Sequence, residues 1–301
     1  MRIEVYLPFL VSVLFGASAP AVARRLPPAQ GTWLLTIGSA VVAVSSALSL
    51  GLLAFTFLGR QPEIAELGHV GVGTFRRHDP VHVSVALSAL VLIPILGGLL
   101  IRTATQRVRA LIAAYRICRG LPDAGTPLVV DPDPGLAAYA VPGRPGRIVV
   151  SRSLLAALPA PERRALLAHE RAHLDRHHHW HLTVVALAAG VDPLLGRLVA
   201  AARHATERWA DEIAADAVGD RAIAATALAR TSLLQTRSGP LAAMGAAGSH
   251  VTERVRILLC APPRNRPVLV ALAAACVIGA ATGALAAGWD AHGLVELAQR
   301  S

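Results

Sequence analysis

The sequence predicts a multi-pass α-helical membrane protein that carries one mainly α (α+β) domain with a small β-sheet. Composition is the first observation, because the 301 residues are 54% hydrophobic and only 16% charged. A soluble domain is about 45–50% apolar and about 25% charged. Second, four apolar runs are long enough to span a bilayer, which takes about 20 residues. Third, a long stretch between the third and fourth runs contains polar helical patterns and short β-branched segments.

The four apolar runs divide the chain. Residues 1–101 form an N-terminal membrane domain, with transmembrane helices expected at about 5–23, 32–58 and 82–101. A fourth helix is expected at 267–289, and residues 290–301 form a short tail. The first run ends in "AVA" at 21–23, which resembles a signal-peptide cleavage site. A retained helix is favoured, because the start is weakly charged and two arginines follow the run.

Arginine placement predicts the orientation in the membrane. The loop after the first run has Arg24 and Arg25 and no acidic residue, and five arginines follow the third run before any acidic residue. The loop at 59–81 is balanced in charge. Because cytoplasmic loops are enriched in basic residues, residues 102–266 are predicted to be cytoplasmic and both termini extracytoplasmic.

The net charge and the cysteines exclude two other classes. The net charge of +10 is accounted for by these loops. The chain has no basic patch with interleaved aromatic residues, so no direct nucleic-acid binding is expected. The three cysteines are far apart and form no CxxC pair, which argues against a disulfide scaffold.

The region 102–266 reads as a folded domain. Strands are expected in the β-branched segments at 126–132 and 146–153, with 136–143 as a candidate third strand. Helices are expected at 159–180, 202–219 and 221–237. Residues 182–200 are apolar but interrupted by Asp192, Pro193 and Arg197. We interpret them as two buried or membrane-skimming helical pieces, since a fifth span would place the flanking helices on opposite sides of the membrane.

Residues 169–173 read HERAH, an HExxH pattern within the first of these helices. Side chains four residues apart share one face of a helix, so His169 and His173 can hold one Zn²⁺ together. Glu170 lies beside the first imidazole, where it can take a proton from the activated water and pass it to the leaving amine. The alternative is a surface helix that carries these three residues by chance.

A catalytic zinc usually takes three protein ligands and leaves one position open. Glu207 on the next polar helix is the best candidate for the third ligand. Asp211 lies four residues on and shares its face, so it can orient a ligand imidazole. The alternative for Glu207 is a solvated helix charge.

The histidine tract continues beyond this pattern. His177 continues the row of His173 by four residues, so it shares the ligand face roughly, although a fourth protein ligand would close the position that water needs. His178, His179 and His181 spread around such a helix, and we expect them at the surface or the membrane interface.

Together these motifs resemble the BlaR/MecR-type integral-membrane zinc metallopeptidases, which are related in their core to HtpX-like and CAAX-prenyl-protease-like peptidases. The resemblance rests on "LLAHERAH" at 166–173, "DPLL" at 192–195 and "ERWAD" at 207–211. Three apolar helices before this region and one after it also match the family's arrangement. The resemblance implies a zincin-like cytoplasmic metallopeptidase domain at 102–266.

The resemblance also implies the residues of the site. Zinc, one ion per chain, would be bound by His169, His173 and Glu207, with Glu170 as general base and Asp211 in support. The segment 136–140 would be the edge strand that pairs with an extended substrate through Ala138, Tyr139 and Ala140. His250 precedes an "ER" pair, as in related peptidases, and would stabilise the oxyanion, although the spacing is shorter here.

The expected function is therefore a membrane zinc endopeptidase that cleaves protein or peptide substrates beside membrane lipid at the cytoplasmic face. Candidate roles are membrane-protein turnover and signalling by cleavage of a transcriptional repressor. BlaR/MecR receptors carry an extracellular penicillin-binding domain, and about a dozen residues after the last helix are too few for one. Two alternatives remain: a catalytically silent receptor or scaffold of the same fold, and a metal transporter with a His-rich loop.

Overall fold

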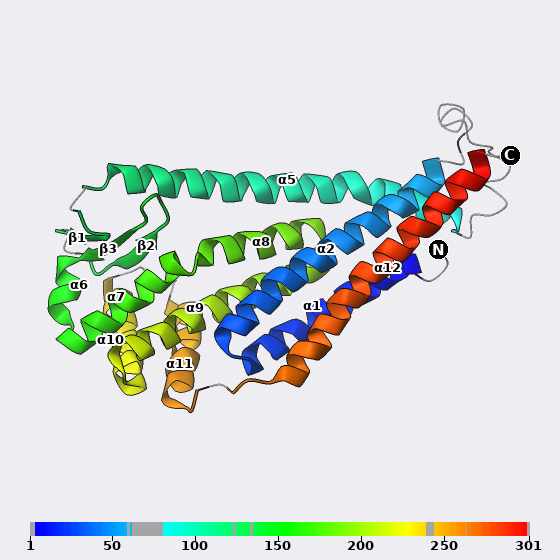
Figure 1. Cartoon of the computed structure of the whole chain (residues 1–301). Coiled ribbons are helices and arrows are strands. Elements are labelled where there is room, and N and C mark those ends of the chain that lie inside the picture. Colours follow the sequence, from blue (N-terminus) through cyan, green and yellow to red (C-terminus); the bar gives the residue numbers. More distant parts are fainter. Residues whose placement is uncertain are drawn as a thin grey trace.

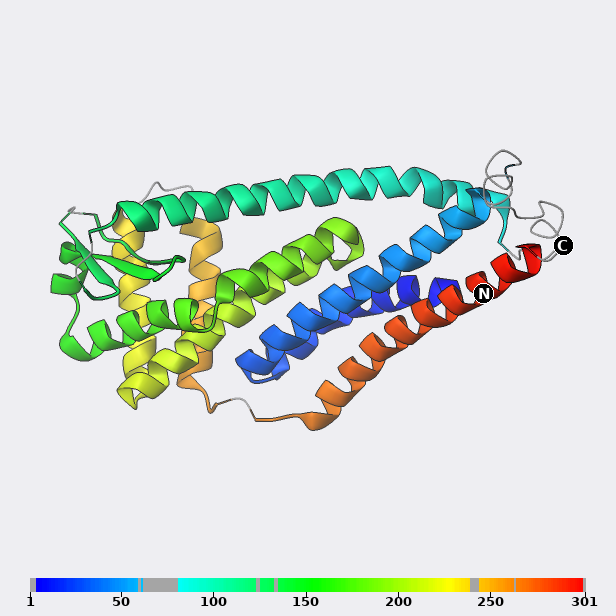
Figure 2. The same ribbon diagram turned by 45° about the horizontal axis from the view of Figure 1, so that its top comes forward.

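The computed structural model describes residues 4–58, 61, 81–122, 125–132, 135–238, 244–262 and 264–299. Side chains are not described at 237–238, 244–250, 294 and 297–299. Figure 1 shows an elongated molecule with long helices at one end and a small sheet with shorter helices at the other. Both labelled ends of the chain lie at the end formed by the long helices (Figures 1 and 2).

Four of the described helices are long and apolar enough to cross a membrane. They are α1 (Leu7–Arg25, preceded by η1 at Glu4–Tyr6), α2 (Pro28–Leu58), α5 (Val83–Gly120) and α12 (Pro267–Gln299). The four expected helices are thus present; α2 begins four residues earlier than predicted, and two others extend much further. Helix α5 continues for a further 19 residues beyond 101, and α12 extends through the expected tail to Gln299. The charge-balanced loop at 59–81 lies, apart from Gln61 and Val81, outside the described residues.

Helices α8 (His178–Val191) and α9 (Gly196–Val218) form a hairpin joined by the short 3-10 helix η2 (Pro193–Leu195). This hairpin packs into the group formed by α1, α2 and α5. Figure 2 shows α8 running between α5 and α2. Its apolar side chains join those of the long helices in one buried cluster that includes Phe15, Leu35, Val42, Leu195 and Leu198. The two helical pieces expected at 182–200 are therefore the two arms of this hairpin at its tip.

The buried carboxylate of Asp192 at the tip of the hairpin is hydrogen-bonded. Asp192 is 5% exposed, and its carboxylate accepts a hydrogen bond from the Ser12 hydroxyl of α1 at 2.6 Å. The same carboxylate caps η2 by accepting from the Leu194 N–H at 3.1 Å. A buried carboxylate needs such donors to offset its loss of water, so Asp192 fastens the tip to α1.

The small sheet has the order β1-β3-β2. Strands β1 (Leu128–Asp131), β2 (Ala138–Val141) and β3 (Arg147–Ser151) correspond to the three expected segments. The central strand β3 is buried along its length and pairs parallel to β1 and antiparallel to β2. Strand β2 therefore forms an edge of the sheet.

Helices α6 (Arg152–Ala157), α7 (Ala160–Asp175), α10 (Arg221–Ser238) and α11 (Met244–Leu259) complete the domain. The prediction of one helix over 159–180 was wrong. Helix α7 ends at Asp175, and His177 adopts the left-handed conformation with φ +50° before α8 begins. After this break, α8 packs against α2 and α5.

Close packing of the hairpin tip on α1 requires a glycine. A Cβ atom at Gly16 would lie 2.5 Å from the carbonyl oxygen of Leu194. We expect Gly16→Ala to lower the free energy of unfolding by about 1–3 kcal/mol through overpacking. Gly51→Ala in α2 is the control, because nothing lies within 4 Å of the added methyl group and alanine favours a helix by about 1 kcal/mol. Thermal unfolding of both variants in detergent measures the difference, and equal melting temperatures would contradict the packing.

Candidate metal centre

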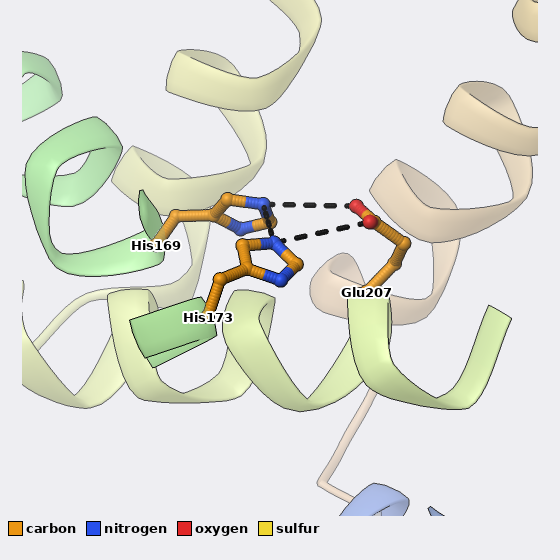
Figure 3. Close-up of side chains that lie close together, drawn as sticks. All are labelled: His169, His173 and Glu207. Atoms are coloured by element: carbon orange, nitrogen blue, oxygen red, sulfur yellow. Dashed lines mark hydrogen bonds and ion pairs between the residues drawn. The ribbon is translucent and has the colours of Figure 1, made fainter. Parts of the chain in front are cut away.

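Helices α7 and α9 pack closely against each other, with small residues at their contact. Ala165, Ala172, Ala210 and Ala214 are each at most 4% exposed on these two helices. Because alanine side chains let two helices approach closely, long side chains from both can meet at the edge of the contact. Figure 3 shows His169 and His173 of α7 facing Glu207 of α9.

The three side chains converge to metal-binding distance. His169 Nε2 lies 3.2 Å from His173 Nε2. Glu207 Oε2 lies 3.7 Å from the first nitrogen, and Glu207 Oε1 lies 3.8 Å from the second. A tetrahedral zinc with bonds of about 2.0–2.1 Å separates its ligand atoms by about 3.3–3.4 Å. The donor set and its spacing therefore fit a zinc ion with one further position for water or substrate.

The first imidazole is oriented by Asp211. His169 Nδ1 lies 3.0 Å from Asp211 Oδ1, which directs Nε2 toward the centre, as is usual for metal-binding histidines. Asp211 is in turn held by Arg254 of α11, which donates two hydrogen bonds to it at 2.6 and 2.7 Å. Arg254 also lies 3.0 Å from Glu207. One buried guanidinium thus fixes both carboxylates.

The second imidazole is oriented by His178. Its Nδ1 lies 2.9 Å from His173 Nδ1. For His173 to offer Nε2 to a metal, its Nδ1 must carry the proton and donate it to His178. His178 is 1% exposed and packs against Trp209 at 5.2 Å between ring centroids. Both imidazoles therefore have a buried partner that sets their orientation.

The ionisable groups around the centre favour a cation there. Burial would lower the pKa of His169, but hydrogen bonds to Asp211 and Glu207 outweigh it and raise that pKa to about 10. Burial and the adjacent His169 lower the pKa of His173 to about 4. Burial would raise the pKa of Glu207, but His169 and Arg254 hold it well below its ordinary value. The carboxylates thus stabilise one positive charge among the imidazoles, which a metal ion can supply in place of a proton.

Glu170 lies between the centre and the edge strand. Burial raises the pKa of its carboxyl above the ordinary value of 4.5, while His169 opposes that rise. The backbone of Ala140 lies close enough to the Glu170 carboxyl to lower its pKa. Strand β2 therefore runs beside the metal centre. Ala138, Tyr139 and Ala140 line a cavity together with His169, Glu170 and Glu207.

The remaining predicted residues are placed differently. His250 belongs to α11, but its side chain lies outside the described part of the chain. His177 is exposed at the left-handed break and lines a separate cavity with Asp175. His178, His179 and His181 are predicted at the surface or the membrane interface, but His178 and His181 are buried inside the protein. His181 Nδ1 lies 3.0 Å from the Thr36 hydroxyl of α2.

Sequence reasoning missed Arg254 and His178 as parts of the site. In the sequence, the "ER" pair that contains Arg254 indicated only the position of His250. His178 was hidden by the assumption of a continuous helix, which placed His177 on the ligand face instead. The left-handed residue shifts the register by one, so that His178 meets His173.

Two imidazoles and a carboxylate at these distances, with a second glutamate beside the first imidazole, are compatible with the metal site of a metallopeptidase. The chain belongs to Peptidase family M48, whose family model matches residues 103–258. This match supports the broad relationship to HtpX-like and CAAX-prenyl-protease-like peptidases. No curated protein and no solved structure matches the chain.

The His178 contact predicts an effect on metal affinity. We expect His178→Ala to weaken zinc binding about 10–100-fold, the usual cost of losing a partner of a metal ligand. His179→Ala is the matched control, because the next residue of the same helix has ring contacts with His177 and Trp180 and not with His173. Competition with a chelator of known affinity measures both variants. Equal affinities would show that His178 does not orient His173.

Proposed function

We propose that this chain is an integral-membrane, zinc-dependent endopeptidase that hydrolyses peptide bonds at the cytoplasmic membrane face. The observation that carries the proposal is the triangle of His169, His173 and Glu207 beside Glu170, with ligand atoms 3.2 to 3.8 Å apart. Membership of a peptidase family supports a peptide bond as the target. A zinc ion held by His169, His173 and Glu207 would polarise the scissile carbonyl and activate a water for attack on it.

Glu170 is the proposed general base. Its carboxyl has a raised pKa through burial, and such a carboxylate accepts a proton more readily than an ordinary glutamate does. It takes the proton of the attacking water and delivers it to the leaving amine. Glu170 lines one cavity with Ala140 of the edge strand, so the base lies beside the strand where a substrate would lie.

Strand β2 is the proposed substrate platform. It is an edge of the sheet, and it lies beside Glu170. An extended peptide can add to such an edge through main-chain hydrogen bonds, here with Ala138, Tyr139 and Ala140. This pairing would place a scissile peptide bond next to the zinc ligands.

The membrane setting is proposed from composition and charge. Four apolar helices and the arginines that follow them favour a cytoplasmic peptidase domain with both termini outside the cytoplasm. Substrates are proteins or peptides close to membrane lipid. A BlaR/MecR-type role, with cleavage of a transcriptional repressor, and membrane-protein turnover are the two candidate processes. The intact ligand set and base weigh against a catalytically silent scaffold, and buried His178 and His181 weigh against a His-rich transporter loop.

Metal content tests the ligand assignment. We expect the purified wild-type chain to hold about one zinc ion and His169→Ala to lose it, because two remaining donors bind zinc far more weakly than three. His177→Ala is the control, since that side chain is exposed and away from the triangle. Elemental analysis after dialysis measures both. Zinc retained by His169→Ala would refute the assignment.

The role of Glu170 is tested separately from metal binding. We expect Glu170→Gln to keep its zinc and to lower kcat about 10²–10⁴-fold, as expected for the loss of a general base. Asp175→Asn serves as control, because Asp175 is exposed at the end of the same helix and pairs with Arg171. Cleavage is measured by comparing the peptides released in cells that express each variant. Unchanged cleavage by Glu170→Gln would exclude this mechanism.

A further inference from the structure

A cavity of about 190 Å³ opens beside the metal centre, between α7, α9, α10 and α11. His169, Glu170 and Glu207 border it on one side. The aliphatic part of its wall includes Ala165, Leu166, Ala214, Ala227 and Leu258. A cavity of about 150 Å³ already holds a benzene molecule. This cavity therefore has room for one amino-acid side chain beside the proposed reaction site, and too little room for a longer stretch of peptide.

Helix α10 provides one wall through a single stripe of side chains. The stripe follows helical spacing of three and four residues and changes along the helix from aliphatic to polar: Ala224, Ala227, Leu228, Thr231, Ser232 and Gln235. The charged residues that border the cavity all belong to the metal centre. Because burying an additional unpaired charge is costly, the cavity suits an uncharged side chain.

Thr231 is the feature that points to a ligand group. It is 7% exposed, and its hydroxyl has no hydrogen-bond partner among the described residues. Two other threonines of α10 behave in the usual way. Thr226 and Thr236 donate to the carbonyl oxygens four residues earlier, at 2.8 and 2.7 Å. Buried hydroxyls are nearly always paired, so an unpaired one in the wall of a cavity is available to a group that enters it.

We propose that this cavity receives the side chain of one of the two residues that flank the scissile bond, and that Thr231 makes it selective. The preferred side chain is uncharged, with an aliphatic stem and a tip that hydrogen-bonds, as in asparagine, glutamine or threonine. Leucine, methionine and valine have similar shapes but leave the buried hydroxyl unpaired. The proposal rests on the proposed peptidase function and adds the residue that determines specificity.

The test uses the full-length zinc-loaded chain and a library of peptides prepared from a whole proteome, with cleavage sites read by mass spectrometry. Wild type is expected to favour asparagine over leucine about five- to tenfold at one position next to the cut, the value of one hydrogen bond. Thr231→Val removes the hydroxyl at constant shape and should abolish this preference. Thr231→Ser restores the hydroxyl and should retain it. Thr226→Val, on the exposed side of the same helix, should cleave like wild type.

The outcomes separate the two proposals. A wild-type preference that disappears in Thr231→Val and persists in Thr231→Ser supports the inference. Cleavage by wild type with the same preference in Thr231→Val overturns the inference and leaves the peptidase function standing. Cleavage of no peptide by the zinc-loaded wild type overturns the peptidase function, and the inference with it.

Discussion

The centre depends on one buried guanidinium. Arg254 is 9% exposed and pairs with both Asp211 and Glu207. Without it, the carboxylates of Asp211 and Glu207 would repel each other and the carboxylate of Glu170. This repulsion is strong in a site that is partly shielded from water. With it, Asp211 can stay ionised and orient His169, while Glu207 stays ionised and turns toward the imidazoles. The contact also holds α11 against α9. The ion pairs that set the ligand geometry therefore also form part of the wall of the cavity beside the metal centre.

Local patterns in the sequence were sufficient for the parts of the site that lie on one helix. His169, Glu170 and His173 follow from helical periodicity, and Glu207 with Asp211 repeats the same spacing on α9. The four long helices follow from apolar length, and two of the three strands follow from β-branched runs between turn residues. These features depend on neighbours within a few residues of each other, which is the range over which sequence patterns are informative.

The features that the sequence did not predict depend on tertiary contacts or on single backbone residues. Arg254 reaches Asp211 across 43 positions, and nothing in its local pattern distinguishes it from a surface arginine. His177 adopts a left-handed conformation that is uncommon for any residue other than glycine, so the continuous helix was the reasonable expectation. That single residue changes which histidine supports the metal ligand. Helix α5 likewise extends beyond the apolar run, because polar residues can continue a helix after its apolar part ends.

Helix α8 links the metal centre to the long apolar helices. His178 and His181 lie almost one turn apart, the first against His173 and the second against Thr36 of α2. At the far end of the hairpin, Asp192 is fastened to α1 through Ser12, and on α9 the guanidinium of Arg208 donates to the carbonyl oxygen of Arg24. The apolar faces of α8 and α9 are buried against α1 and α2, which precede the region matched by the family. The long helices are therefore part of the hydrophobic core that positions His173 and Glu207. For this reason, the geometry of the site is a property of the whole chain.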